Sequence, residues 1–346
     1  MALTPEPPNL QTDYPWIRQP LIVGAPMRLI AAAPLAVEIS KAGGIGFIGG
    51  GTDLSTLSSH LTHASTLLSS LSPPLPVPSP AILPIGIGII NFGASLPSLL
   101  AAITLHTPAA IWFFAPSSLP SLVTWTTAVR STTQNRTKIW IQTSTVTSAL
   151  AIVSSCSPDV LVLQGTDAGG HGLNACASIV TLVPETIDAV TALCTSSSPT
   201  SYSSSENPRD PTPKLPLFIA AGGLTDGRSL AAALTLGAVG GAVGTRFLCT
   251  HEASIAAGYQ RALLSTRDGG VTTLRTRLYD SLRGTPEWPA GYGGRGGEEG
   301  WGVEGRLTMY AGTGVGLVRE VCAAKEVVER VRRDAVGVLR GLGGKL

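Results

Sequence analysis

The segment LPLFIAAGGLTDGRSLAAALTLGAVGGAVGTRFL, residues 215–248, contains two strand patterns separated by a helix pattern. The first apolar run, Leu215–Ala221, leads into a Gly-Gly pair, and the second, Gly240–Gly244, ends in Gly and leads into Thr. Short runs that are apolar throughout are typical of parallel strands buried on both faces, with helices connecting them. The segment therefore predicts an α/β fold with glycine loops at the carboxyl ends of two strands.

The same alternation begins near residue 20. It predicts eight strands in all, at Leu21–Ala25, Ile45–Ile48, Pro84–Ile90, Ala110–Phe114, Lys138–Thr143, Val160–Gln164, Leu215–Ala221 and Gly240–Gly244. Helix patterns lie between or after them, at Ala32–Ala42, Leu54–Leu71, Leu96–Leu105, Leu119–Ser131, Val146–Ser155, Ile179–Cys194, Asp226–Leu236 and Glu252–Leu264. This order predicts a closed (βα)8 TIM barrel. The alternative is an open doubly wound sheet, which usually has about six strands and a phosphate loop after the first one.

The rest of the chain predicts additions to this barrel. We expect three regions: an amino-terminal extension over 1–19, the barrel over 20–265, and a carboxyl-terminal part over 266–346. The last region contains a Gly-rich stretch, Gly291–Gly302, and a helix pattern at Val315–Leu339 whose apolar face predicts packing on the barrel exterior. Ser72–Pro80 and Ser196–Pro216 are rich in Ser and Pro and are expected to be exposed insertions.

The composition narrows the choice of partner and compartment. Charged residues make up 13% of the chain and the net charge is +2, so we expect neither nucleic acid nor a membrane as a partner. Five scattered cysteines without a CxxC motif, and no secretory signal, predict a cytoplasmic protein with reduced thiols. The terminal Gly-Lys-Leu is one residue away from the Ser-Lys-Leu peroxisomal address. The oligomeric state is left open.

The two glycine loops of the opening segment predict a phosphate site. Gly222 and Gly223 follow the seventh strand, and Gly244 and Thr245 follow the eighth. In TIM barrels these two loops commonly bind phosphate, because backbone N–H groups can converge on an anion where no Cβ atom obstructs them. An ordinary pair of tight turns is the alternative interpretation.

A second motif, VLQGTDAGGHG over residues 162–172, follows the sixth strand. A histidine flanked by glycines at the carboxyl end of a barrel strand points to the usual active-site face, and its near-neutral pKa suits acid–base work. His171 is therefore the candidate catalytic base. His60 and His63 form a pair on a predicted helix with no third ligand nearby, so no metal site is expected.

A third group of residues is expected around the same barrel mouth. Ala25, Pro26 and Met27 follow the first strand and offer backbone groups and a thioether to a flat apolar ligand. Asn91 ends the third strand and Gln142 lies near the end of the fifth, so two amides are placed to read the edge of a heterocycle.

Taken together, these motifs resemble the nitronate monooxygenases, formerly called 2-nitropropane dioxygenases. The resemblance extends from about Leu21 to Gly316. It rests on Ala-Pro-Met after the first strand, on the Gly-Gly-His loop and on the two phosphate loops. Arg283-Gly-Thr, Trp288-Pro289 and Ala311–Gly316 resemble the fungal-type branch of the family.

The resemblance implies an FMN-dependent monooxygenase that oxidises alkyl nitronates or nitroalkanes with O2 to a carbonyl compound and nitrite. His171 would remove the α-proton of a nitroalkane or steer a bound nitronate. The residues implied for FMN are Ala25, Pro26, Met27, Asn91, Gln142, Gln164, Gly169, Gly170, Gly222, Gly223, Gly244 and Thr245. The Gly312–Gly316 loop would close over the flavin.

Two other functions are compatible with the same motifs. Flavin-dependent enoyl-acyl-carrier-protein reductases share the Gly-Gly-His loop and would require NAD(P)H. A non-redox barrel that binds a phosphate ligand would use the same two glycine loops. The sequence does not identify the substrate, and the segments 196–216 and 291–302 leave the rim of the site undefined.

Overall fold

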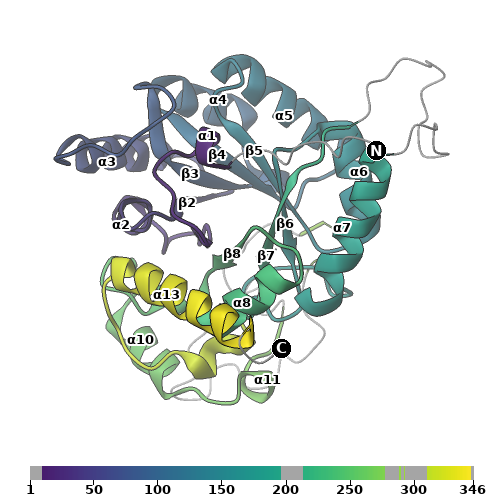
Figure 1. The fold of residues 1–346 in the computed structure, drawn as a ribbon. Helices are drawn as coiled ribbons and strands as arrows, with labels where there is room; N and C mark the ends of the chain where they lie inside the picture. Colours follow the sequence, from purple (N-terminus) through teal and green to yellow (C-terminus); the bar gives the residue numbers. More distant parts are fainter. Residues whose placement is uncertain (1–9, 196–212, 277–287, 290–291, 293–309, 344–346) are drawn as a thin grey trace.

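The computed structural model describes residues 10–195, 213–276, 288–289, 292 and 310–343. Its centre is a closed barrel of eight parallel strands arranged in sequence order (Figure 1). The strands are β1 (Leu21–Gly24), β2 (Ile45–Gly51), β3 (Ile82–Ile90), β4 (Thr107–Phe114), β5 (Lys138–Thr143), β6 (Val160–Gln164), β7 (Leu217–Ala221) and β8 (Gly240–Val243). The closed barrel confirms the predicted TIM fold and excludes the open sheet, and each predicted strand overlaps an observed one.

Seven helices each follow one of the strands β1 to β7. They are α2 (Ala33–Lys41), α3 (Leu57–Ser69), α4 (Leu96–Leu105), α5 (Leu119–Thr133), α6 (Val146–Cys156), α7 (Ile179–Thr195) and α8 (Gly227–Thr235). Ser95, Ser118 and Thr145 each accept a hydrogen bond from the backbone N–H of the third residue of the helix they precede. Such caps satisfy backbone donors that have no partner within the helix, and they fix where α4, α5 and α6 begin.

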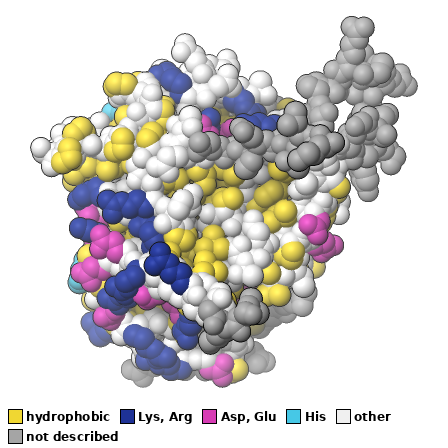
Figure 2. All heavy atoms as spheres, in the orientation of Figure 1, with side chains coloured by type: hydrophobic (Ala, Val, Ile, Leu, Met, Phe, Trp, Pro, Cys, Tyr) yellow, Lys and Arg dark blue, Asp and Glu magenta, His cyan; other side chains and the backbone are white. Residues whose placement is uncertain are grey.

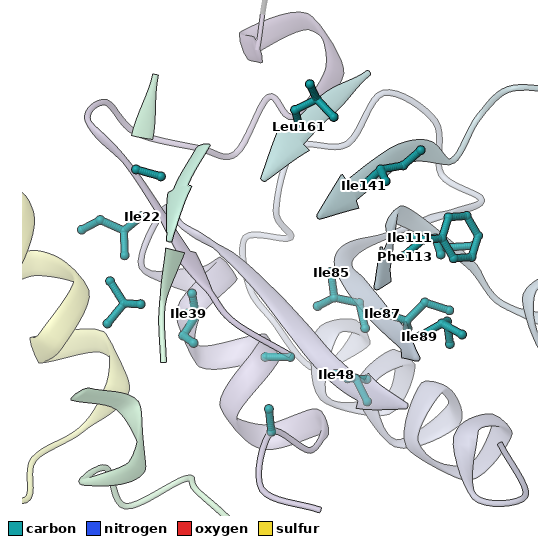
Figure 3. Close-up of a cluster of buried hydrophobic side chains, with 14 of the residues drawn as sticks. Ile22, Ile39, Ile48, Ile85, Ile87, Ile89, Ile111, Phe113, Ile141 and Leu161 are labelled. Carbon is teal, nitrogen blue, oxygen red and sulfur yellow. The ribbon is translucent and has the colours of Figure 1, made fainter. Parts of the chain in front are cut away.

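Alternate residues of the strands supply two hydrophobic layers. Ile85, Ile87 and Ile89 of β3 belong to the layer between strands and helices, as do Ile111 and Phe113 of β4 (Figure 3). The residues in between face the barrel interior, because successive side chains of a strand point to opposite faces. Three interior rings, of Phe47, Trp112 and Trp140, lie with centroids 5.0–6.1 Å apart.

The amino-terminal end of the barrel is filled by residues of the predicted extension. After the short helix α1 (Leu10–Asp13), Tyr14 and Trp16 are buried with the interior cluster. The Trp140 indole Nε1 donates to the Tyr14 hydroxyl at 2.7 Å, and Asp13 pairs with Lys138 at the start of β5 at 2.6 Å. Burial raises the pKa of Tyr14 well above its ordinary value, so the hydroxyl is neutral and accepts this bond. Leu10, Tyr14, Trp16 and Ile17 thus belong to the interior cluster of the barrel, which the sequence pattern did not show.

The eighth outer helix is not the predicted one. Helix α10 (Ala257–Ser265) overlaps the expected Glu252–Leu264, but it packs on η2 (Thr313–Leu317), a short 3-10 helix, and not in the ring. The place between α8 and α2 is taken by α13 (Ala324–Gly343), drawn yellow in Figure 1.

One half-buried arginine joins α13 to the barrel. The Arg332 guanidinium donates to the backbone oxygens of Pro20, Ala42 and Gly43 at 3.3, 3.0 and 2.7 Å. Burial lowers the pKa of Arg332 to about 10. Helix α13 packs against α8 and α2 and so completes the ring of outer helices.

The start of the final helix was predicted nine residues too early, at Val315 instead of Ala324. Cys322 forms a parallel bridge with Thr250, and this pairing keeps the chain extended. The Arg246 guanidinium donates to the backbone oxygen of Glu320 at 3.3 Å and to the Cys322 sulfur at 3.0 Å. The helix begins at Ala324, whose backbone N–H donates a hydrogen bond to the carboxylate of Glu252 at 2.9 Å.

Charged side chains gather on one part of the face drawn in Figure 2. Figure 2 shows Lys and Arg side chains mixed with Asp and Glu at the lower left, on the side where α13 lies in Figure 1. Ser72–Pro80 is largely exposed, as expected, whereas 196–212 and most of Gly291–Gly302 lie outside the described residues. Every helix among the residues described is too short or too polar to serve as a membrane span.

We predict that Tyr14→Phe lowers the free energy of unfolding by about 1–3 kcal/mol, because the buried Trp140 N–H loses its acceptor. Urea denaturation measures the loss. The control is the double variant Tyr14→Phe/Trp140→Phe, which has lost the indole N–H as well and so contains no buried donor without an acceptor at this place. Its loss should be smaller than the two single losses combined, and strictly additive losses would contradict the role of the hydrogen bond.

Candidate active site

A cavity of about 400 Å³ opens at the carboxyl ends of the strands. This volume lies in the range typical of small-molecule sites. Twelve predicted site residues line it together: Ala25, Pro26, Met27, Gln142, Gln164, Gly169, Gly170, His171, Gly222, Gly223, Gly244 and Thr245. Asn91 begins the 3-10 turn η1 (Asn91–Gly93) and is not among the lining residues described. The structure thus brings all but one of the predicted residues to one mouth of the barrel.

The loops after β7 and β8 present backbone to the cavity. Gly222 and Gly223 have φ angles of +116° and +71°, and residues with a Cβ atom rarely adopt such positive values. A Cβ atom on Gly222 would also lie only 3.0 Å from the Ala168 nitrogen. In the loop after β8, the Thr245 hydroxyl accepts a hydrogen bond from the backbone N–H of Gly312 at 2.9 Å. The hydroxyl proton of Thr245 is therefore directed away from Gly312 and can be donated to a ligand.

A segment from the carboxyl-terminal part, residues 311–317, packs on these loops. A Cβ atom on Gly312 would lie 2.4 Å from the Asp167 oxygen, and one on Gly169 would lie 2.6 Å from the Gly312 nitrogen. Thr313 donates its N–H to the Asp167 backbone oxygen at 3.1 Å and its hydroxyl to the carboxylate at 2.9 Å. The His171 loop and the segment 311–317 therefore meet backbone to backbone.

Amide side chains from neighbouring strands lie below the His171 loop. Gln164 Nε2 donates to the backbone oxygen of His171 at 3.2 Å, while its buried Oε1 has no hydrogen-bond partner among the described residues. Gln142 Oε1 accepts the Trp112 indole N–H at 2.9 Å, so its NH2 group remains to face the cavity. Asn91 is buried, and neither of its amide atoms has a partner within the described part of the chain.

The opposite wall is aromatic. The His171 imidazole stacks on the Trp288 indole, with ring centroids 3.9 Å apart and planes 14° apart. Phe92 and Phe114 touch the same indole, with centroids 4.8 and 5.9 Å away, and Tyr310 lies 5.4 Å from His171. A histidine thus stands between a glycine-lined and an aromatic part of one cavity.

Comparison with known proteins identifies the family of this chain. A family model described as nitronate monooxygenase matches residues 123–284. The chain is 38% identical to the nitronate monooxygenase npaC of Metarhizium robertsii, over 95% of each chain. It is 32% identical to a nitronate monooxygenase of Neurospora crassa, over 94% of this chain and 92% of the relative. The chain belongs to the nitronate monooxygenase family.

Solved structures share the fold of this family member. A nitroalkane oxidase from Streptomyces ansochromogenes matches with a TM-score of 0.69 at 18% identity, covering 96% of this chain and all of the other (100%). FabK from Thermotoga maritima matches with a TM-score of 0.68 at 20% identity, covering 97% and 98%. At such identities the matches speak for the architecture alone. The family assignment makes the protein an oxidoreductase.

Sequence reasoning did not identify the aromatic side of this nitronate monooxygenase site. Phe92, Phe114 and Tyr310 lie on three separate segments, and no spacing marks them as neighbours. Trp288 stood out only through the resemblance of its Trp-Pro pair. The local signal available for Phe92 and Phe114 was their position at the carboxyl ends of β3 and β4, where TIM barrels place functional residues.

We predict that Gly312→Ala destabilises the protein by about 1–3 kcal/mol, because the added methyl group collides with the Asp167 oxygen. Gly337→Ala is the matched control: it lies in α13 with no atom within 4 Å of its Cβ position. That variant should gain about 0.5–1 kcal/mol from helix propensity. Thermal denaturation compares the two, and equal effects would contradict the close packing of segment 311–317.

Proposed function

We propose that the protein is an FMN-dependent oxidoreductase that uses O2 to oxidise alkyl nitronates to a carbonyl compound and nitrite. It would act on neutral nitroalkanes as well, after His171 has removed their α-proton. The observation that carries the proposal is the meeting of His171 with two glycine loops in one cavity of a family member. The cofactor, the base and the use of O2 are the elements that experiment has to establish.

The residues present fit a flavin mononucleotide. Gly222 and Gly223 offer N–H groups where a side chain would be strained, and Thr245 offers a hydroxyl, as a phosphate requires. The orphaned Oε1 of Gln164 is a buried acceptor that a heterocyclic N–H would satisfy. Ala25–Met27 provides an apolar platform on the β1 side of the cavity. FMN would supply the site with an electron acceptor that dioxygen can reoxidise.

His171 is suited to move a proton at this site. Its backbone is held by Gln164 and its ring by Trp288, so the imidazole has a defined direction. An imidazole with a pKa near neutrality is an efficient base at physiological pH. A nitroalkane would lose its α-proton to a ring nitrogen of His171, and the electron pair of the broken C–H bond would form the C=N bond of the nitronate. The aromatic wall would keep water away from this exchange.

We predict that Gly222→Ala weakens FMN binding by about 10-fold or more, because a Cβ atom at φ +116° forces the loop to move. Quenching of FMN fluorescence measures the dissociation constant. Gly337→Ala, remote from the cavity, should bind FMN as the unchanged protein does. Equal affinity of the Gly222→Ala variant would place the phosphate elsewhere.

We predict that His171→Ala retains FMN but oxidises nitroalkanes about 10²–10⁴-fold more slowly, because the general base is lost. Nitronates prepared in alkali need no proton removal and should lose much less activity. Oxygen consumption and nitrite release measure both rates. His63→Ala, an exposed histidine on α3, is the matched control and should behave as the unchanged protein. Full turnover of a nitroalkane by His171→Ala would overturn the assignment of the base.

A further inference from the structure

Among the residues that the structure describes, Trp288 makes the closest aromatic ring contact with His171. The two rings are almost parallel, 14° apart, with centroids 3.9 Å apart. A parallel stack of this kind covers one face of the imidazole and leaves its edge, which carries both nitrogens, outside the contact. Rotation of the imidazole about its Cβ–Cγ bond would drive the ring edge into the indole. The stack therefore holds the direction in which the nitrogens point.

The indole is itself held from several sides. Phe92 of η1 lies with its centroid 4.8 Å away, Phe114 at the end of β4 lies 5.9 Å away, and Tyr292 lies 6.0 Å away. Tyr292 forms an antiparallel bridge with Leu173, two residues beyond His171, and donates its N–H to the Pro289 oxygen at 3.1 Å. The indole of Trp288 is thus contacted by Phe92 after β3, by Phe114 at the end of β4 and by Tyr292 of the carboxyl-terminal part. These contacts hold the plane of the indole.

The charged side chains described at the His171 loop bind other groups of the chain. In the same loop, the Asp167 carboxylate accepts the hydroxyl of Thr313 at 2.9 Å. Arg275 donates to the backbone oxygens of Ala168 and Leu173 at 3.3 and 2.8 Å. Of the two tyrosines on this wall, Tyr310 has its ring centroid 5.4 Å from that of His171. Burial raises the pKa of the other, Tyr292, to about 12.

We propose that Trp288 is the positioning residue for proton abstraction by His171. The inference rests on the proposed function and deepens it. The indole fixes the imidazole in the direction needed to reach the α-carbon of a nitroalkane, and its π face stabilises the imidazolium that forms when the proton arrives. Oxidation of a nitronate supplied as such does not pass through this proton transfer. Trp288 therefore matters for neutral nitroalkanes and much less for nitronates.

The test compares Trp288→Leu and Trp288→Phe with the unchanged FMN-loaded protein. Trp125→Phe is the matched control, because Trp125 is buried on α5 against Phe113, in the layer between strands and helices. Nitroethane and its preformed nitronate are the substrates, and kcat/KM is measured from pH 5 to 9. Side-chain ¹⁵N NMR follows the titration of His171 in the same variants, and this readout is independent of turnover.

Trp288→Leu should lower kcat/KM for nitroethane about 10-fold or more while changing that for the nitronate by less than about 3-fold. Loss of the stack should lower the pKa of His171 by about half a unit or more, since the imidazolium is no longer stabilised. The base is active when neutral, so the rising limb of the nitroethane profile should move to lower pH. Trp288→Phe should restore part of both effects.

Two results would overturn the proposal and are distinguishable from each other. Equal losses for nitroethane and nitronate in Trp288→Leu, with an unchanged titration of His171, would make Trp288 a wall of the cavity only. Inactivity of the unchanged FMN-loaded protein towards both substrates would overturn the proposed function, and this inference with it.

Discussion

Backbone-to-backbone contact at the mouth of the barrel is the constraint on which the site depends. Gly312 and Gly169 approach so closely that a methyl group on either would collide with the other's loop. This contact places the segment 311–317 against the loops after β6 and β7, and it sets Tyr310 beside His171. Had either position carried a side chain, the carboxyl-terminal part would stand away from the mouth. This packing explains why glycine stands at positions 169 and 312.

The same carboxyl-terminal part also completes the barrel. Helix α9 (Thr245–Leu248), which follows β8 directly, has only four residues and cannot cover the outer face between α8 and α2. That place is filled by α13, which Arg332 joins to the backbone at Pro20, Ala42 and Gly43. Trp288, Tyr310 and Gly314, which lie between these two helices in the sequence, line the cavity, so one stretch of chain contributes both to the outer layer of the barrel and to its mouth. A loss of α13 packing should therefore also shift the residues of this stretch that line the cavity.

Local patterns in the sequence were sufficient for the barrel and for one side of the site. The eight apolar runs mark the strands because both faces of a barrel strand are buried, and the glycines that follow β6, β7 and β8 directly mark the loops at the mouth. What failed depended on contacts between distant segments. The role of Tyr14 rests on Trp140, the start of α13 rests on the pairing of Cys322 with Thr250, and the aromatic wall gathers from separate loops. No periodicity in a single stretch records such contacts.

The central claim is that this cavity holds a flavin that nitronates reduce. The most direct measurement is the visible spectrum of the protein after loading with FMN and removal of free flavin, followed under anaerobic conditions as ethylnitronate or NADH is added. We expect a bound flavin whose absorbance is bleached by ethylnitronate and left unchanged by NADH, with the yellow colour restored by air. A protein that retains no flavin, or whose flavin is bleached by NADH and not by the nitronate, would contradict it.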